Sequence, residues 1–326
     1  MTTLVTGGNG WVPSHIVRRL AARGEQVVSF DLMEPDHLVL DLLGPLVGRV
    51  TFVHGDIADR AALSRACHDH GVDAIVHAAV ITPRRDREQR EPARIVEVNL
   101  TGTVSALEAA RGIPGLRRFV YISSGAVWGE APGAATLDEE SPANAVSLYG
   151  ITKLASERIA LRYGDLFGMD VAAARPANVY GPMERITPGY AGATELREML
   201  RIHAAGEEIR VTSLDGPWLD WTYVEDIAEG VERVWAAGNL PHRVYSVTCG
   251  RLYSIGDVLR TWASILPDLR YRVVPAGEAN YPVAGGPPGP IPSNARLAAD
   301  LGWVPSTPFA DGMRQYLAWV EENGPQ

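Results

Sequence analysis

The sequence predicts an α/β fold, a doubly wound parallel sheet with a smaller C-terminal lobe. Three observations lead to this class. Short apolar runs recur along the chain with helix-patterned segments between them, the first run enters a glycine-rich turn, and the regular alternation lapses after Pro182. Strands that are apolar along their whole length suit a sheet whose two faces are both covered by crossover helices.

The apolar runs place the strands and divide the chain. The predicted strands are Leu4–Thr6, Val27–Phe30, Val50–Val53, Ala74–Val76, Phe119–Ile122 and Val171–Ala174. Residues 1–180 are expected to form the first domain, with return segments near 220–250, and residues 181–326 the smaller, interleaved lobe. The dense proline and glycine between Pro275 and Pro292 predict a long loop. The amphipathic Phe309–Glu322 stretch is expected to be a helix that packs the second lobe.

The turn after the first strand has the pattern of a dinucleotide-binding loop. Gly7 permits the tight turn, and Gly10 lets a pyrophosphate approach the backbone at the N-terminus of the following helix. The next strand ends in Asp31, about 20 residues beyond the turn, where a carboxylate accepts hydrogen bonds from a ribose and repels a 2′-phosphate. Residues 1–180 are therefore predicted to be a dinucleotide-binding domain that takes NAD rather than NADP.

A second set of polar side chains stands where a reaction could occur. Ser123 and Ser124 follow a buried strand at its carboxyl edge, where ligands bind in open α/β sheets. Tyr149 and Lys153 are four residues apart and so share one face of a helix. An ammonium at about 4 Å can supply the roughly 4 kcal/mol that lowers a tyrosine pKa by about three units. We therefore expect Lys153 to bring the pKa of the Tyr149 phenol toward the working pH.

With these segments in view, the chain resembles the extended short-chain dehydrogenase/reductases, which have a Rossmann fold, and specifically the NAD-dependent epimerase/dehydratase family. The resemblance covers nearly the whole chain. It rests on Thr6–Gly10, Gly55–Ile57, His77–Ala79, Asn99–Thr103, Ser123–Ser124, Tyr149 with Lys153, Arg175–Pro182 and Tyr223–Ala228. The order and spacing of these segments are specific for the fold and weakly specific for the substrate.

The resemblance implies a role for each matching residue. The implied catalytic residues are Ser124, Tyr149 and Lys153, with Ser123 as the fallback hydroxyl. The implied NAD contacts are Gly7, Asn9, Gly10, Trp11, Val12, Asp31, Leu32, Asp56, Ile57, Ala78, Ala79, Asn99, Ile122, Tyr149, Lys153 and Pro176. The implied substrate contacts are Ser124, Gly125, Ala126, Tyr149, Asn178 and Arg185. Asp56 would accept a hydrogen bond from the adenine amine, Asn99 would support the backbone of the cofactor loop, and His77 is interpreted as structural.

Three positions depart from the family pattern. Pro13 stands where the family has its third glycine, a place that the first turn of a helix tolerates. Trp128 replaces the commoner tyrosine after Val127 and gives a bulkier wall. Leu219 stands where members that act on nucleotide-diphosphate sugars carry an arginine, and the loop from Ala284 to Ser293, where they carry another, has no basic residue.

The missing arginines bear on the substrate. Two lost charge-assisted hydrogen bonds, of about 1.5–3 kcal/mol each, weaken a diphosphate ligand by about a hundredfold to ten-thousandfold. Arg185, Arg210 and Arg296 are the cations left to compensate. The leading hypothesis is therefore an NAD-dependent oxidoreductase of carbohydrate metabolism. It would transfer a hydride between NAD and a carbinol or carbonyl carbon of a small sugar-like or hydroxy-acid substrate without a diphosphate, with Tyr149 as general acid/base.

Other functions stay open. The alternative is a nucleotide-sugar epimerase that keeps its NAD tightly bound. A dehydratase is less favoured because Gly125 follows Ser124 where the family's dehydratases carry an acidic residue. A non-enzymatic dinucleotide sensor is less favoured because Tyr149 and Lys153 are both present.

Composition excludes other classes of partner. The 326 residues carry a formal charge of −9, so no basic stripe is available for nucleic acid, and the arginines of 84–90 are interleaved with acidic residues as in a solvated loop or helix. The two cysteines, Cys67 and Cys249, have no metal-ligand spacing and read as reduced thiols. No metal site is expected.

The location and assembly of the protein follow from weaker signals. The first strand starts at the second residue, which leaves no room for a signal peptide, and no apolar run reaches the roughly 20 residues of a membrane helix. A cytoplasmic protein without a membrane partner is expected. The resemblance also implies a homodimer through the helices around Val104–Ala110 and Leu154–Tyr163.

Overall fold

A computed structural model describes the chain except residues 83–84, 130, 132–133, 191–193 and 325–326. At its centre lies a seven-stranded parallel sheet in the order β11-β7-β5-β4-β1-β2-β3. The strands are β1 (Thr2–Thr6), β2 (Gln26–Asp31), β3 (Val50–His54), β4 (Ala74–His77), β5 (Arg118–Ile122), β7 (Val171–Pro176) and β11 (Val244–Val247). Each predicted run lies inside one of these strands, and the predicted fold class is confirmed.

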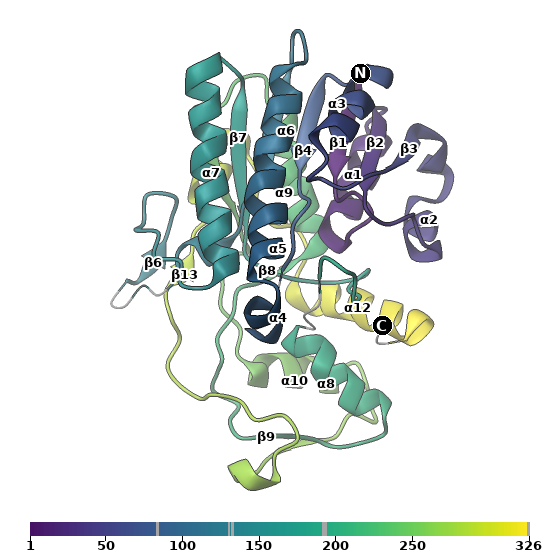
Figure 1. Cartoon of the computed structure of the whole chain (residues 1–326). Helices are drawn as coiled ribbons and strands as arrows, with labels where there is room; N and C mark the ends of the chain where they lie inside the picture. Colours follow the sequence, from purple (N-terminus) through teal and green to yellow (C-terminus); the bar gives the residue numbers. More distant parts are fainter. Residues whose placement is uncertain (83–84, 130, 132–133, 191–193, 325–326) are drawn as a thin grey trace.

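Helices cover both faces of this sheet (Figure 1). Val5 and Val120 pack in one apolar cluster with residues of α1 and α9, whereas their neighbours Leu4 and Phe119 pack in another with residues of α3, α6 and α7. These helices are α1 (Trp11–Ala22), α3 (Arg60–Asp69), α6 (Gly102–Arg111), α7 (Leu148–Phe167) and α9 (Val224–Ala236). Since successive side chains of a strand point to opposite faces, a wholly apolar run requires both covers.

Short elements lie in the connections between the strands. They are α2 (His37–Leu43), η1 (Gly44–Arg49), α4 (Arg85–Arg90), α5 (Pro92–Val96), the π-helical turn η2 (Glu97–Thr101) and η3 (Gly125–Val127). The arginine-rich segment from Arg85 on is thus a short helix with ion pairs one turn apart, Arg90 to Asp86 at 3.1 Å and Arg87 to Glu91 at 3.3 Å. Arg84 lies outside the described residues.

The rest of the chain contributes smaller elements, several of which lie below the sheet, where Figure 1 shows α8, α10 and β9. Three two-stranded parallel pairs belong to it: β8 (Asn178–Tyr180) with β10 (Trp221–Tyr223), β9 (Ile209–Val211) with β12 (Tyr271–Val273), and β6 (Thr136–Leu137) with β13 (Ile291–Pro292). The remaining elements are α8 (Glu195–Ala204), α10 (Ile255–Ala263), η4 (Ala276–Glu278), α11 (Ala295–Leu301) and α12 (Phe309–Asn323). The last is the helix predicted at 309–322.

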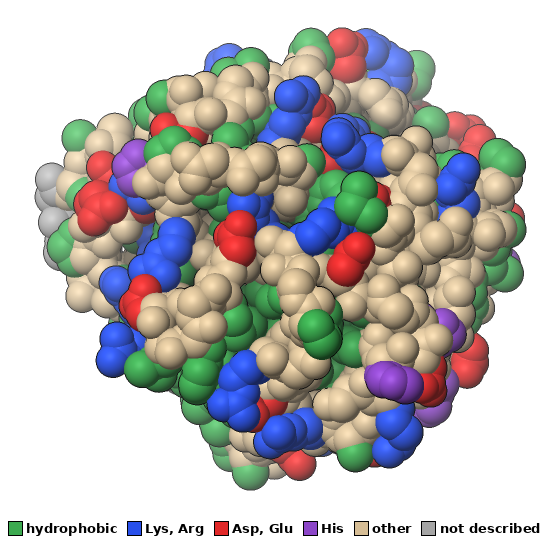
Figure 2. Space-filling view, turned by 90° about the horizontal axis from the view of Figure 1, so that it is seen from above, with side chains coloured by type: hydrophobic (Ala, Val, Ile, Leu, Met, Phe, Trp, Pro, Cys, Tyr) green, Lys and Arg blue, Asp and Glu red, His purple; other side chains and the backbone are tan. Residues whose placement is uncertain are grey.

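The surface carries both signs of charge. Figure 2 shows basic and acidic side chains interspersed over the end of the molecule away from α8 and α10. Across the described residues, no helix combines the length and the apolar run that a bilayer crossing needs.

Candidate active site

A cavity of about 840 Å³ opens where β1, β2, β4, β5 and β7 end. The predicted cofactor contacts that line it are Gly7, Gly10, Trp11, Val12, Asp31, Leu32, Asp56, Ile57, Ala78, Ala79, Ile122, Tyr149, Lys153 and Pro176. The predicted substrate contacts that line it are Ser124, Gly125, Ala126, Tyr149 and Asn178. One cavity therefore brings together segments that lie far apart in the sequence, from Gly7 to Asn178.

The first turn requires its glycines. Gly7 has φ +68°, and a Cβ there would stand 2.9 Å from the Cα of Ala79. A Cβ on Gly8 would stand 2.3 Å from Ser29 Oγ. Gly10 is the N-cap of α1, whose first turn has no acidic side chain, so its free N–H groups suit an anion. These features fit a dinucleotide pyrophosphate.

Asp31 stands at the end of β2, on the rim of the cavity. Its two carboxylate oxygens accept hydrogen bonds from the backbone N–H groups of Met33 and Asn9, both at 2.9 Å. Burial raises the pKa of Asp31 above its usual value, although these two hydrogen bonds oppose the shift. Each oxygen keeps a further lone pair, so the carboxylate fits the ribose hydroxyls of NAD.

Asp56 is held by a residue that the sequence did not single out. Its carboxylate accepts from the Ala58 N–H at 2.9 Å and from Arg94 Nη2 at 2.6 Å. Burial acts to raise the pKa of Asp56, but these two hydrogen bonds and the positive charge of Arg94 together outweigh it, and the pKa lies below its usual value. Arg94 also lines the cavity, so the expected adenine end holds an ion pair and not a lone carboxylate.

Two of the predicted cofactor contacts, Asn9 and Asn99, place their side chains behind the wall of the cavity. The Asn9 side chain accepts from Ser29 Oγ at 2.8 Å and donates to Met33 O at 2.6 Å. Asn99 bonds both backbone groups of Ile81 and lies 2% exposed. Neither is among the described lining residues of the cavity. Asn99 thus supports the backbone at Ile81. In this structure neither the Asn99 side chain nor the Asn9 side chain faces the cavity that would hold NAD.

His77 forms part of a buried polar network. Thr6 Oγ1 accepts from two backbone N–H groups after β4, so its single proton goes to His77 Nδ1 at 2.8 Å. Nε2 then carries the ring proton and donates to Thr103 Oγ1 at 3.0 Å. Burial, aided by the charge of Lys153, lowers the pKa of His77 to about 3. A neutral, fully bonded imidazole supports the structural interpretation.

Tyr149 and Lys153 come from the first turns of α7, where Ser147 caps the helix by accepting from the Gly150 N–H. Lys153 is the only lysine of the sequence, and its Nζ donates to Ile122 O at 2.6 Å. The same nitrogen lies 5.8 Å from the centroid of the Tyr149 ring. Both side chains face the cavity next to Ser124.

The expected acidification of Tyr149 by Lys153 is wrong for the protein alone. Burial raises the pKa of Tyr149 above its usual value, and hydrogen bonds with Ser124 and Thr82 only oppose this shift. Burial also lowers the pKa of Lys153 to about 7. Sequence spacing indicates that the two groups are neighbours, but desolvation of both depends on their depth in the fold. Near neutral pH much of the expected ammonium charge is therefore lost.

The two serines after β5 have different partners. Ser123 is 2% exposed and its Oγ donates to Glu157 Oε2 at 2.7 Å. Ser124 is partly exposed, and its Oγ accepts from the Ala126 N–H at 3.1 Å and forms a hydrogen bond with Tyr149. The Ser123 proton is committed to a carboxylate, so Ser124 is the hydroxyl available to a substrate.

The far end of the cavity is lined mostly by apolar residues, namely Trp218, Leu219, Trp221, Leu252, Gly289, Pro290 and Pro292, with Asp220 among them. The Asp220 carboxylate accepts hydrogen bonds from the hydroxyls of Thr222 and Thr248. Among the described lining residues the cations are Arg87, Arg94 and Lys153. Arg87 pairs with Glu91 and Arg94 with Asp56, so neither is a free cation at that end.

Arg185 does not take the predicted place at the substrate. Its side chain is 6% exposed, with Nε 3.0 Å from Asp36 Oδ2 and Nη2 donating to Asn9 O at 2.8 Å. Arg185 therefore holds the Gly7–Gly10 loop through the Asn9 carbonyl oxygen and does not line the cavity. Arg210 and Arg296, the other cations considered as compensation, are likewise absent from the described lining of the cavity.

Several lining residues escaped sequence reasoning. Thr82 touches the Tyr149 phenol, and its N–H donates to Gly189 O at 2.7 Å. That contact brings Tyr190 over the cavity, where its ring lies 5.7 Å from the Trp11 ring. The contacts of Thr82 with Gly189 and of Trp11 with Tyr190 join residues more than 100 positions apart, and no local pattern marks them.

A glycine loop with a strand-end carboxylate, facing a serine, a tyrosine and a lysine across one cavity, defines a dinucleotide-dependent enzyme of the short-chain dehydrogenase/reductase type. Residues 3–248 match the model of the NAD dependent epimerase/dehydratase family, and the chain belongs to this family. It is an NAD-dependent enzyme, and NAD as its cofactor is confirmed.

Relatives extend along the whole chain. The dTDP-glucose 4,6-dehydratase of Xanthomonas campestris pv. campestris (strain B100) is 27% identical, over 99% of this chain and 93% of the relative. A putative UDP-glucose 4-epimerase of Methanocaldococcus jannaschii is 29% identical, over 98% of each. The solved structure of the Thermus thermophilus UDP-glucose 4-epimerase with NAD has a TM-score of 0.80 and 27% identity, over 98% of this chain and 99% of that one.

Proposed function

We propose that the protein oxidises a carbinol carbon of a sugar with bound NAD and that Tyr149 exchanges the proton of the reacting hydroxyl. The observation that carries this proposal is the convergence of Ser124, Tyr149 and Lys153 on the cavity whose other end is the Gly7–Gly10 loop. NAD, when bound, takes up and returns the hydride. The hydroxyl of Ser124 would donate to the substrate oxygen, as in a small oxyanion site.

The pKa values indicate when Tyr149 becomes a base. Since burial raises the pKa of Tyr149 in the protein alone, the phenol stays protonated until positive charge enters the cavity. Oxidised nicotinamide is a cation and would supply it, while the hydrogen bonds from Ser124 and Thr82 favour the phenolate. Lys153 would hold the nicotinamide ribose. Coupling deprotonation to the bound oxidised cofactor prevents the base from forming before NAD is in place.

We propose a nucleotide sugar as the substrate and epimerisation as the reaction. Curated relatives are named as dehydratases and epimerases of dTDP-glucose or UDP-glucose, which favours this substrate over the small, diphosphate-free one that the missing arginines suggested. Gly125 beside Ser124 leaves no acidic group at the dehydratase position. In an epimerase the hydride returns to the same sugar, so NAD would copurify with the protein and no net NADH would form.

One observation favours a second candidate function, that of a dehydrogenase acting on a small sugar or sugar acid. The far end of the cavity is lined by Trp218–Trp221, Leu252, Gly289, Pro290 and Pro292, where a diphosphate would meet mostly apolar side chains and the carboxylate of Asp220. Charged groups buried without partners are strongly disfavoured.

A substrate panel tests both candidates. The purified protein is incubated with UDP-glucose, dTDP-glucose, UDP-glucuronic acid and free sugars or sugar acids, and the products are analysed by NMR together with NADH absorbance. A 4-epimer without net NADH supports the first candidate. Net NADH from a free sugar only would replace it with the second, and no turnover on either set would reject hydride transfer to sugars.

We also propose that the chain forms a homodimer through α6 and α7. Ile151, Leu166 and Phe167 on α7 are 47%, 55% and 44% exposed, which is a large apolar exposure for one helix. A monomer by light scattering at micromolar concentration would contradict this.

A further inference from the structure

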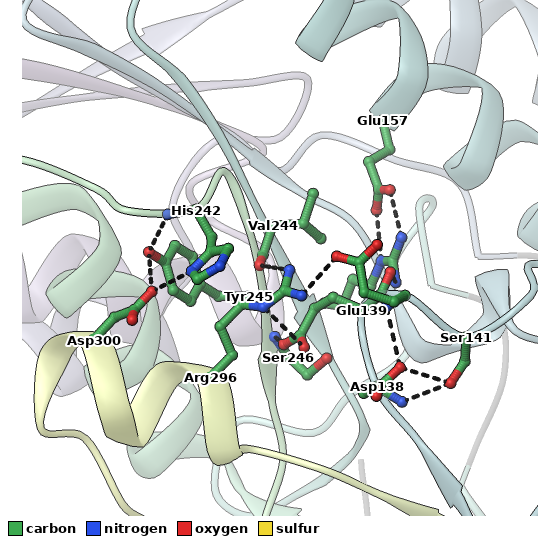
Figure 3. Close-up of polar contacts among 12 residues, drawn as sticks. Asp138, Glu139, Ser141, Glu157, His242, Val244, Tyr245, Ser246, Arg296 and Asp300 are labelled. Atoms are coloured by element: carbon green, nitrogen blue, oxygen red, sulfur yellow. Dashed lines mark hydrogen bonds and ion pairs between the residues drawn. The ribbon is translucent and has the colours of Figure 1, made fainter.

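A chain of buried polar side chains runs behind the cavity from the active-site serines to the edge of the sheet. We call Ser123, Glu157, Arg175, Glu139 and Arg296 the polar chain. Figure 3 shows its outer part, in which Glu139 lies between Arg296 and the backbone of Ser246. None of the five residues has a role in the proposed reaction.

The inner end of the polar chain is a fully satisfied ion pair. Glu157 and Arg175 are 0% and 2% exposed, and they meet through two hydrogen bonds, from Nε at 2.9 Å and from Nη2 at 2.7 Å. Ser123 adds a third hydrogen bond to the same carboxylate. Glu157 lies one helical turn beyond Lys153 on α7, so this pair fixes the catalytic helix against the ends of β5 and β7.

The outer end joins that pair to the segment after β6. Arg175 donates its remaining Nη1 to the carbonyl oxygen of Glu139 at 3.3 Å. The Glu139 carboxylate is 3% exposed; it accepts from the Ser246 N–H of β11 at 2.6 Å and lies 3.4 Å from Arg296 Nε. Glu139 is therefore the residue at which β7, β11 and α11 all attach.

The segment held in this way is a wall of the cavity. β6 and β13 form a two-residue parallel ribbon through hydrogen bonds from Ile291 N to Ala135 O at 3.1 Å and from Ser293 N to Leu137 O at 2.7 Å. Leu137 and Pro292 of this ribbon line the cavity. So short a two-stranded ribbon is not stable by itself, and Ile291 is 40% exposed. The position of the β6–β13 ribbon therefore depends on the contacts that attach it to the sheet.

We propose that Glu139 is a positioning residue that holds the β6–β13 ribbon against the strand ends carrying the active site, so that the substrate end of the cavity keeps its shape. The term substrate end rests on the proposed function, whereas the attachment of the ribbon does not. The neighbouring Glu140 offers a matched control. It contacts the same Arg296, at 2.6 Å, but its side chain is 79% exposed and solvent can replace it.

The experiment compares Glu139→Gln with Glu140→Gln in the full-length protein. Glutamine keeps the size and an acceptor for the Ser246 N–H but removes the charge facing Arg296. Hydrogen–deuterium exchange is followed at the amides of Ile291 and Ser293, which donate the ribbon hydrogen bonds. We expect exchange about tenfold faster in Glu139→Gln, the effect of weakening one charge-assisted contact, and unchanged exchange in Glu140→Gln. Equal exchange in the two variants overturns the proposal.

Kinetics then test the link to the substrate. We expect Glu139→Gln to raise KM about tenfold with kcat within about twofold and with an unchanged affinity for NAD, because the ribbon lies away from the glycine loop. Faster exchange with an unchanged KM would overturn the link to the substrate end. If the wild-type protein turns over no substrate of the panel, the proposed function fails, and the exchange measurement still decides whether Glu139 holds the ribbon.

Discussion

The two ends of the cavity are built differently. At the cofactor end, the first strand, its glycine turn and the carboxylate that ends the next strand all lie within residues 2–31, and the Asp56–Arg94 pair completes this end. The far end, where we propose that the substrate binds, is assembled from Trp218–Trp221, Leu252, Gly289, Pro290 and Pro292. One end is encoded by a local pattern, the other by contacts between distant segments. A sequence can therefore identify the cofactor while leaving the substrate open.

The ends also differ in charge. Asp31 and the Asp56–Arg94 pair stand at the cofactor end, whereas at the far end Asp220 is the charged residue beside Leu219, and its carboxylate is bonded to Thr222 and Thr248. Between them lie Tyr149 and Lys153, whose pKa values burial moves in opposite directions, upward for Tyr149 and down to about 7 for Lys153. Changes at the centre should abolish the reaction, and changes at either end should alter recognition of one ligand.

Removing the phenol oxygen tests the centre. Tyr149→Phe should lower kcat by about a thousandfold to ten-thousandfold, since a general acid/base contributes on that order, with NAD affinity nearly unchanged. Steady-state kinetics and an NAD titration followed by tryptophan fluorescence measure the two quantities. Tyr163→Phe on the same helix, whose hydroxyl bonds Glu108 at 3.0 Å, is the control and should keep kcat. A Tyr149→Phe enzyme with more than about a tenth of wild-type kcat would remove the proposed mechanism.

Lys153→Met tests the buried ammonium. Between pH 7 and the ordinary lysine value of 10.5, the unfolded chain binds a proton that the folded protein does not, so this group makes the free energy of unfolding rise with pH across that window. Methionine has no ionisable group, so this contribution to the free energy of unfolding disappears in the variant. The variant should be more stable than the cofactor-free wild type by up to about 4 kcal/mol near pH 7 and equal to it near pH 10. Its affinity for NAD should fall.

Urea unfolding at several pH values measures this difference, and no second lysine complicates it. Leu40→Met, an exposed position on α2, controls for the new side chain. The same pH dependence in Lys153→Met and wild type would show that the ammonium is not destabilised by burial.

Particular residues show how far the sequence could be read. The apolar runs located the strands. Gly7 lies in the turn, Gly10 at the N-terminus of α1 and Asp31 at the end of β2, as expected, because turn and strand-end patterns are local. The expected effect of Lys153 on Tyr149 was wrong because spacing on a helix gives proximity but not depth. Arg185 was misplaced because a basic side chain in a loop can turn toward either partner, and its actual partners, Asp36 and Asn9, are about 150 and 176 positions away.

Asp31→Asn tests the cofactor end. Losing charge-assisted hydrogen bonds to the ribose should raise the Kd for NAD about tenfold to a hundredfold, while the loss of repulsion should lower the Kd for NADP. The ratio of the two constants, from equilibrium titration, is the readout. Glu34→Gln, a few residues away and 76% exposed, should leave that ratio unchanged. An unaltered ratio in Asp31→Asn would mean that this carboxylate does not face the ribose.

Leu219→Arg tests the substrate end and separates the two candidate substrates. If a nucleotide sugar lies along Leu219, a guanidinium there should contact its diphosphate and lower the Kd for UDP about tenfold. This figure is the weaker end of the range for a charge-assisted hydrogen bond, because the contact would be partly solvated. Leu252→Arg places the same charge elsewhere on the wall and distinguishes a specific contact from general attraction. Equal gains in both variants would indicate only the field of an added cation. A different outcome would be that UDP binds neither variant and that Leu219→Arg raises KM for a free sugar acid. The substrate that meets Leu219 would then carry no diphosphate, and the second candidate function would replace the first.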